Sequence, residues 1–313
     1  MSAPPAPPPT AAPPTRPPTG LGDRIRANGS LLTTAVVWGS FFPLIDHLLQ
    51  TWDTLTLAAA RLGFAALGLL TALVLREGWR ALSGPLPWRR IWLAGGCGLG
   101  GFTFLITVGI GASGAVPAAV ISTSSPVIAL ILAWALGHVP LRRAALIGVA
   151  FAVSGGLVVV FAPGRAFEGM RGGEVFVLLA AIAWVWQSLM SQQWLVGLSQ
   201  LRVAALLSAA GALNLVAVAS ILALTGMTSP MVDVSPGSLA ILAYLALVGG
   251  SLGNFLWYFG VSRLGVTIAS MYNNLIPVFA VLVALLLGTE LIWTQLAGGA
   301  LILMGVIWAQ RGR

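Results

Sequence analysis

The chain has 313 residues, of which 58% are hydrophobic and only 8% are charged, and its formal net charge is +8. A soluble domain of this length could not bury so much apolar surface, so the composition excludes a soluble protein and predicts an all-α membrane protein. Every basic residue is an arginine. In a protein with many spans such an excess sets topology, so we expect a lipid-bilayer partner and no nucleic acid.

The chain is poor in residues that hold metals or carry reactive groups. Cys97 is the only cysteine, and the two histidines lie far apart in the sequence. These counts predict neither a disulfide framework nor a metal site, and we expect no cofactor. The sequence also lacks a phosphate-binding loop, which argues against direct use of ATP.

The first 28 residues form a tail rich in proline, which predicts disorder. Ten apolar segments follow, each about long enough to cross a bilayer. We place them at 30–50, 54–75, 91–111, 114–136, 143–162, 174–195, 202–224, 238–260, 265–287 and 292–310.

An internal repeat relates the two halves of the chain. A constant offset of 151 residues aligns Gly114 with Gly265 and Pro126 with Pro277. We therefore expect two five-helix repeats, at 29–162 and 173–310, making ten transmembrane helices in all. Five spans is an odd number, so the second repeat enters the membrane upside down relative to the first.

The arginines indicate the orientation. With the N-terminus in the cytoplasm, thirteen arginines fall inside, Arg165 and Arg171 fall outside, and Arg61 lies within a span. This bias follows the positive-inside rule and predicts that both termini are cytoplasmic.

Several of these features resemble a known family. The run from Ala269 to Phe279, with Glu290 and Gly298 after it, resembles the EamA repeat, and Trp38 is echoed by Trp184. The chain is therefore identified, over about residues 30–310, with the ten-helix branch of the drug/metabolite transporter superfamily. The resemblance implies a carrier of small metabolites, often amino acids, with a central cavity between the halves. The resemblance is compatible with a homodimer.

Two prolines are candidate hinges. Pro126 should free the backbone carbonyl of Ser122, and Pro277 that of Asn273, because proline lacks the N–H that would bond four residues back. In a bilayer a freed carbonyl must face protein or a wet cavity, which favours the central cavity. The alternative is that both prolines only shape helix packing.

Polar and aromatic residues share faces of several spans. In the sixth span Trp184, Gln187 and Ser188 lie on one helical face. Such faces suit a flat or amphipathic solute, and the alternative is that they only join neighbouring helices. The candidate substrate-binding residues are Trp38, Phe41, Arg61, Ser122, Ser125, Trp184, Gln187, Asn254, Tyr258, Tyr272, Asn273 and Asn274.

Arg61 and Asp46 are the charged candidates. An arginine inside a span needs a partner or water, and Asp46 lies at a similar depth. The two could form an ion pair, a gate at the outer mouth, or a site for a substrate carboxylate. Arg61 could instead extend outward to the membrane surface. Asp46 is also the candidate for coupling to protons.

These features together favour a secondary transporter, and an exporter in particular. We expect it to move small neutral, zwitterionic or amphipathic metabolites such as amino acids by alternating access. The competing class is a receptor or a membrane-embedded enzyme, but the sequence shows no catalytic constellation. The absence of lysine with abundant alanine and arginine suggests a bacterial inner (plasma) membrane.

Overall fold

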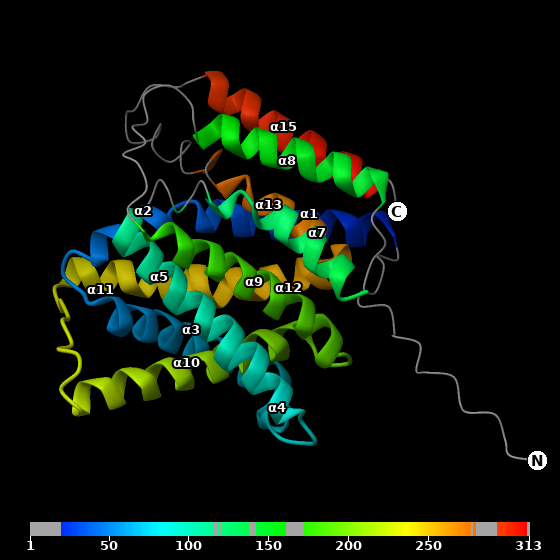
Figure 1. Cartoon of the computed structure of the whole chain (residues 1–313). Coiled ribbons are helices and arrows are strands. Elements are labelled where there is room, and N and C mark those ends of the chain that lie inside the picture. The colour runs from blue at the N-terminus through cyan, green and yellow to red at the C-terminus, as the bar shows by residue number, and fades with distance from the viewer. Residues whose placement is uncertain are drawn as a thin grey trace, which may run out of the picture.

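The computed structural model describes residues 20–114, 118, 121–137, 142–160, 172–276, 278–279 and 293–311. Every regular element in these ranges is a helix (Figure 1). Six helical spans are long and apolar enough to cross a membrane, which confirms the prediction of a multi-pass α-helical protein. They are Leu21–Leu48, Thr54–Glu77, Trp88–Ser113, Glu174–Trp194, Gln200–Leu224 and Pro236–Leu264.

The first span begins earlier than expected and is broken. Helix α1 runs from Leu21 to Trp38, so residues 21–28 belong to a helix and not to the tail, whose residues 1–19 lie outside the described ranges. Helix α2 (Phe41–Leu48) follows after a turn. Pro43 lies in its first turn, where a missing N–H costs no helical bond, and this explains why the chain starts a new helix there.

The next spans match the predicted ones closely. Helix α3 (Thr54–Glu77) is continuous, and a short 3₁₀ turn, η1 (Trp79–Leu82), connects it to the third span. That span joins α4 (Trp88–Ile91), the π-helical segment η2 (Trp92–Gly100) and α5 (Gly101–Ser113).

In the second half, α9 (Glu174–Trp194) and α10 (Gln200–Leu224) are single helices. The eighth span joins α11 (Pro236–Ala243), the π-helical segment η3 (Tyr244–Leu252) and α12 (Gly253–Leu264). The third and eighth spans thus carry a π-helical stretch at matching positions. Both end at a glycine with positive φ, Gly114 (85°) and Gly265 (77°). The predicted pairing of these two glycines is therefore also a structural one, because each ends its helix in the same way.

The remaining predicted spans are shorter in the described residues. They contain α7 (Ser125–Ala135), α8 (Arg143–Val160), α13 (Val266–Asn273) and α15 (Trp293–Arg311). Parts of the fourth, fifth, ninth and tenth predicted spans lie outside the described residues, and so does Pro277. The described ranges therefore do not establish the total of ten crossings.

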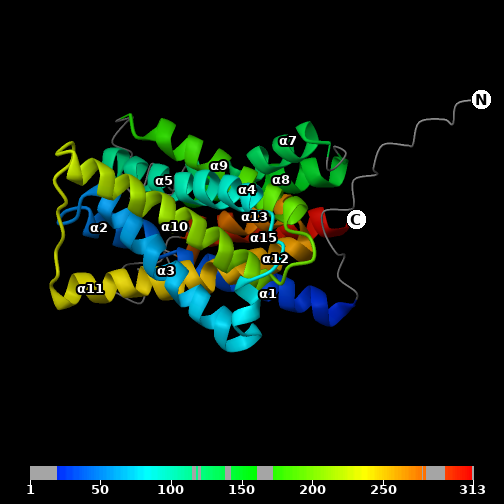
Figure 2. The same ribbon diagram turned by 90° about the horizontal axis from the view of Figure 1, so that it is seen from below.

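Helices from the two halves interleave. Figure 1 shows α8 and α15 side by side at one face, and Figure 2, seen from below, shows α3 and α10 together. Helix α3 of the first half also packs on η3 of the second half, and α10 of the second half packs on η2 of the first. Each of these elements thus packs on an element of the other half, and the two contacts match. Such an arrangement is typical of an internal repeat with approximate two-fold symmetry.

Glycines let α8 and α15 approach closely. A Cβ atom added at Gly155 would lie 2.5 Å from the carbonyl oxygen of Gly298, and one added at Gly305 would lie 2.5 Å from that of Gly148. These glycines serve helix packing, because only a residue without a side chain leaves room for the facing backbone.

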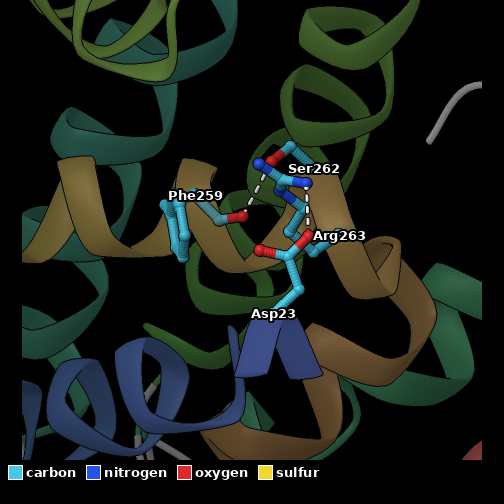
Figure 3. Close-up of polar contacts among 4 residues, drawn as sticks. All are labelled: Asp23, Phe259, Ser262 and Arg263. Carbon is cyan, nitrogen blue, oxygen red and sulfur yellow. Dashed lines mark hydrogen bonds and ion pairs between the residues drawn. The ribbon is translucent and has the colours of Figure 1, made fainter. Parts of the chain in front are cut away.

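The two ends of the helical bundle are held by different polar contacts. At one end Arg263 of α12 forms an ion pair with Asp23 of α1, with 2.9 Å between Nη1 and Oδ2 (Figure 3). The Arg263 guanidinium also lies over the ring of Phe259. At the other end Asp53, the N-cap of α3, accepts hydrogen bonds from the backbone N–H groups of Thr56 and Met231 at 2.9 Å.

We expect the Asp53 clasp to make stability depend on pH. Burial raises the pKa of the Asp53 carboxyl, but hydrogen bonds from Thr56 and Met231 outweigh it and hold the pKa below the ordinary 3.8. A carboxyl with a depressed pKa in the folded state stabilises that state above its ordinary pKa and loses this contribution as pH falls through the folded value. Thermal unfolding in detergent should therefore show a drop in stability below about pH 4. The drop should be smaller in Asp53→Asn, and equal drops in both proteins would contradict the assignment.

Candidate functional site

A cavity of about 110 Å³ lies between the two halves of the chain. Its walls come from α1, α2, α3 and α5 on one side and from α9, η3 and α12 on the other. An engineered protein cavity of about 150 Å³ admits benzene, so this space is of the right order for a small organic group. The lining is mostly apolar, with a few polar side chains such as Thr103, Ser125 and Asn254.

Three tryptophans pack together beside this cavity. The ring centroids of Trp38 and Trp184 are 5.3 Å apart, those of Trp184 and Trp257 are 5.1 Å apart, and those of Trp38 and Trp257 are 5.8 Å apart. The ring centroid of Phe102, in α5, lies 4.7 Å from that of Trp184. These spacings fall in the range of favourable aromatic contacts, so the cluster forms a rigid wall assembled from both halves.

The three indole N–H groups differ in their partners. Trp257 donates to the Ser188 hydroxyl at 3.0 Å, and Trp38 donates to the Gly249 carbonyl at 3.0 Å. The N–H of Trp184 is buried and has no partner among the described residues, although the side chain is only 3% exposed. A buried donor without an acceptor is costly, so this group is a candidate to bind a solute.

Arg61 lies in the same cavity and is only 7% exposed. Its guanidinium carbon is 5.8 Å from the centre of the Phe41 ring, and Nη1 has no hydrogen-bond partner in the described part of the chain. The expected ion pair with Asp46 does not form among these residues. Asp46 lines a separate cavity of about 490 Å³ with Gln50 and Thr54. Arg61 does not extend to the membrane surface either, because the helices around it bury the side chain.

Most of the predicted site residues meet at this cavity. Those that line it are Trp38, Phe41, Arg61, Ser122, Ser125, Trp184, Asn254 and Asn273. Gln187 and Tyr258 lie behind the wall, where the Tyr258 hydroxyl donates to Gln187 Oε1 at 2.8 Å. Asn274 donates to the Ala152 carbonyl at 2.8 Å, and the Tyr272 hydroxyl bonds to Asn28. These last four residues therefore connect helices and do not line the cavity.

Pro126 does not act as expected. The chain turns at Thr123 and Ser124, and α7 starts at Ser125, so Pro126 occupies the first turn of a new helix and breaks no bond within it. The Ser122 carbonyl is not free, because the Ser125 hydroxyl donates to it at 2.7 Å. The prediction of an unpaired carbonyl facing the cavity is wrong in this half. The matching turn in the second half falls at Asn274 and Leu275, next to Pro277, which lies outside the described residues.

Two glycines related by the repeat make close contacts with site residues. A Cβ added at Gly98 would lie 2.5 Å from the Gln187 Cβ on α9, and one added at Gly249 would lie 1.8 Å from the Phe41 ring on α2. Gly98 and Gly249 are related by the repeat. The sequence analysis did not assign either glycine to the site, although their separation by the repeat offset of 151 residues could have pointed to them.

The comparisons with known proteins agree with this architecture. A family model described as the EamA-like transporter family matches residues 26–161 and again residues 171–310. The chain belongs to the EamA-like transporter family. It is a multi-pass membrane transporter, so its partners include a small-molecule substrate and the lipid bilayer.

Relatives of this EamA-family chain are themselves named as transporters or exporters. The Bacillus subtilis (strain 168) protein named Uncharacterized transporter YyaM is 23% identical over 284 residues, covering 89% of this chain and 92% of the relative. A protein of Streptantibioticus cattleyicolor named Probable terminal-alkyne amino-acid exporter is 28% identical over 295 residues, covering 91% and 94%. The Escherichia coli (strain K12) inner membrane transporter YedA, also named as uncharacterized, is 26% identical over 274 residues, covering 84% and 83%.

A solved crystal structure shares the fold. It superimposes with a TM-score of 0.73 at 21% sequence identity and covers 91% of this chain and 96% of its own. At this identity the likeness concerns the fold alone, and it shows that the helices of this chain follow an arrangement seen in a solved structure.

Proposed function

We propose that this EamA-family protein is a secondary exporter of small neutral, zwitterionic or amphipathic metabolites such as amino acids, working by alternating access. The observation that carries the proposal is a cavity lined by helices of both halves of a duplicated family domain. Carriers built this way bind solute between the repeats and expose the site to each side in turn. The substrate and direction are supported by the relative that is named as an amino-acid exporter.

The proposed binding wall consists of the cavity residues Trp38, Phe41, Trp184 and Asn254. Aromatic rings give apolar contact area at low conformational cost, and the few polar groups orient a solute. Gln187, Tyr258, Tyr272 and Asn274 would act one layer back, by holding the wall in place.

The test is transport by the purified protein in proteoliposomes, with labelled amino acids and with or without a pH gradient. We expect uptake above that of empty vesicles, and we expect it to be lost in Trp38→Ala. Trp308→Ala is the matched control, because Trp308 is 47% exposed on the outer face of α15. Its replacement should leave transport unchanged. No movement of any amino acid, or normal transport by Trp38→Ala, would contradict the proposal.

Asp46 is the proposed coupling residue if a pH gradient drives transport. It lies outside the central cavity, so any coupling would act through movement of α2 rather than by contact with solute. Asp46→Asn should then abolish the effect of the gradient while leaving exchange of solute across the membrane intact. A gradient effect that persists in Asp46→Asn would remove this role.

We also propose a bacterial inner-membrane location with both termini cytoplasmic. The arrangement of the helix ends supports this orientation, because arginines gather at one end of the bundle. There Arg202 bonds the Ser83 carbonyl and Arg263 pairs with Asp23, whereas Asp53 and the loop at Met231 meet at the other end.

Cysteine labelling in intact cells should report this orientation. In a background with Cys97→Ala, Val234→Cys should react with a membrane-impermeant maleimide, and Trp79→Cys should react only after lysis. Both side chains are at least 70% exposed, so accessibility to reagent depends on the side of the membrane. The reverse labelling pattern would reject the orientation.

A further inference from the structure

We propose that the central cavity selects solutes by a carboxylate, which Arg61 and the indole N–H of Trp184 bind, and that an amino group on the solute is not required. This inference rests on the proposed function for bringing a solute into the cavity, and it deepens that proposal by naming the group that is recognised.

The first observation is an unbalanced charge. Arg61 is the only charged residue among the described residues that line the cavity, and Asp46, the acidic candidate nearest in depth, faces a different cavity. A buried arginine without a counter-charge is strongly unfavourable. A bound anion would supply that counter-charge, and the planar guanidinium fits a carboxylate with two parallel hydrogen bonds.

The second observation is an independent donor in the same space. The Trp184 N–H is buried without a described partner, while the indole groups of Trp38 and Trp257 are both satisfied. Arg61 contacts Phe41, Phe41 lies beside Trp38, and Trp38 lies against Trp184. Arg61 and Trp184 also line the same cavity of about 110 Å³, so both donors belong to one small space. The described lining thus offers two hydrogen-bond donors without partners and contains no carboxylate. It is complementary to a solute group that accepts hydrogen bonds.

The lining narrows the class of anion further. A phosphate ester carries more charge and normally needs several basic groups, whereas a single arginine matches a single negative charge. The rest of the wall is apolar and aromatic, which favours an organic body over an inorganic ion. No described acidic side chain in the cavity is available to pair with an ammonium group. The class is therefore small organic monocarboxylates with an apolar or aromatic body, amino acids included.

The test compares matched probes on the full chain in lipid nanodiscs by calorimetry. The probes are 3-methylbutanoate, 3-phenylpropanoate and phenylalanine, each with its primary amide, together with 3-phenylpropylamine. Each carboxylate should bind at least about 30-fold more tightly than its amide, the scale expected for a buried charge pair. The amine should not bind. Because this comparison uses the wild-type protein, it does not depend on the folding of any variant.

Two variants then assign the donors. Arg61→Gln should weaken carboxylate binding by about 30-fold and reduce the preference over the amide. Trp184→Phe keeps the ring, removes the N–H, and should weaken binding by about 5-fold. The matched controls are Arg263→Gln, whose arginine is paired outside the cavity, and Trp186→Phe, whose ring packs edge to face against Trp194 and does not line the cavity. Neither control should change the preference.

Several results would overturn the inference. These are equal binding of acids and amides, no binding of any carboxylate, full competition by chloride or inorganic phosphate, or an unchanged preference in Arg61→Gln. The proposed function can fail separately. Carboxylates that bind in nanodiscs but do not cross proteoliposomes would leave the site in place and remove the transport proposal. Transport of amides as fast as acids would leave the transport proposal in place and remove the carboxylate site.

Discussion

Gly155→Ala is expected to prevent the accumulation of folded protein. The added methyl group would lie 2.5 Å from the Gly298 carbonyl oxygen and 2.8 Å from the backbone nitrogen of Ile302. Both atoms belong to the α15 backbone, so no side chain can turn aside and the two helices must separate. Overpacking of this kind costs about 1–3 kcal/mol or more, and here it acts along a whole helix pair.

The measurement is the yield of monodisperse protein and the midpoint of thermal unfolding in detergent. Gly63→Ala is the matched control, because nothing lies within 4 Å of a Cβ built at Gly63 in α3. That control should be neutral or slightly more stable, since alanine restricts the unfolded chain more than glycine does. Wild-type yield and stability in Gly155→Ala would show that α8 and α15 are not held together at this contact.

Gly249→Ala is expected to abolish transport with a smaller effect on folding. The new Cβ would lie 1.8 Å from the Phe41 ring, so the ring must move. Phe41 lines the cavity and contacts both Arg61 and Trp38, and the displaced ring would disturb the whole aromatic wall. Because the obstacle is a side chain rather than backbone, we expect a loss of about 1–3 kcal/mol in stability.

The experiment combines transport assays with thermal unfolding, and a second substitution tests the cause. Phe41→Leu in the Gly249→Ala background should restore part of the lost stability, because the smaller side chain leaves room for the methyl group. Gly101→Ala is the control, since a Cβ at Gly101 meets nothing within 4 Å. If Phe41→Leu gives no recovery of stability, the steric explanation is wrong.

The repeat and the aromatic wall were predictable from sequence for physical reasons. Hydropathy determines which segments can lie in a bilayer, and matched glycines survive as a readable offset because few residues can replace them at close contacts. The pairing of Gly114 with Gly265 is confirmed by their shared positive φ. Trp38 and Trp184 were grouped from their repeat-like positions, and they do pack together.

The local backbone was not predictable to the same degree. A proline shows where a helical bond is missing, but not whether the helix bends or restarts. At Pro126 it restarts, and Ser125 supplies the missing donor, which a count of backbone bonds alone does not reveal. The break at Pro43 was missed altogether, although the same reasoning would have located it.

The partner of a buried polar residue was also beyond sequence reasoning. Gln187 lies on the predicted polar face with Trp184, yet it bonds Tyr258 rather than facing the cavity. Helical spacing defines a face about a third of the circumference wide, whereas lining a cavity requires a narrower direction that neighbouring helices determine. The burial of Arg61 away from Asp46 was unpredictable for the same reason.

The unequal bonding of the two tryptophans has a consequence for release of solute. Trp38 donates to the carbonyl of Gly249, whereas Trp184, its counterpart, does not bond the carbonyl of Gly98, the repeat mate of Gly249. If the two halves exchange conformations during transport, Trp184 gains the Gly98 carbonyl and Trp38 loses that of Gly249. Solute and backbone would then compete for one N–H group. The affinity for solute would then differ between the two sides of the membrane. The solute would be released when the Trp184 N–H exchanges it for the Gly98 carbonyl.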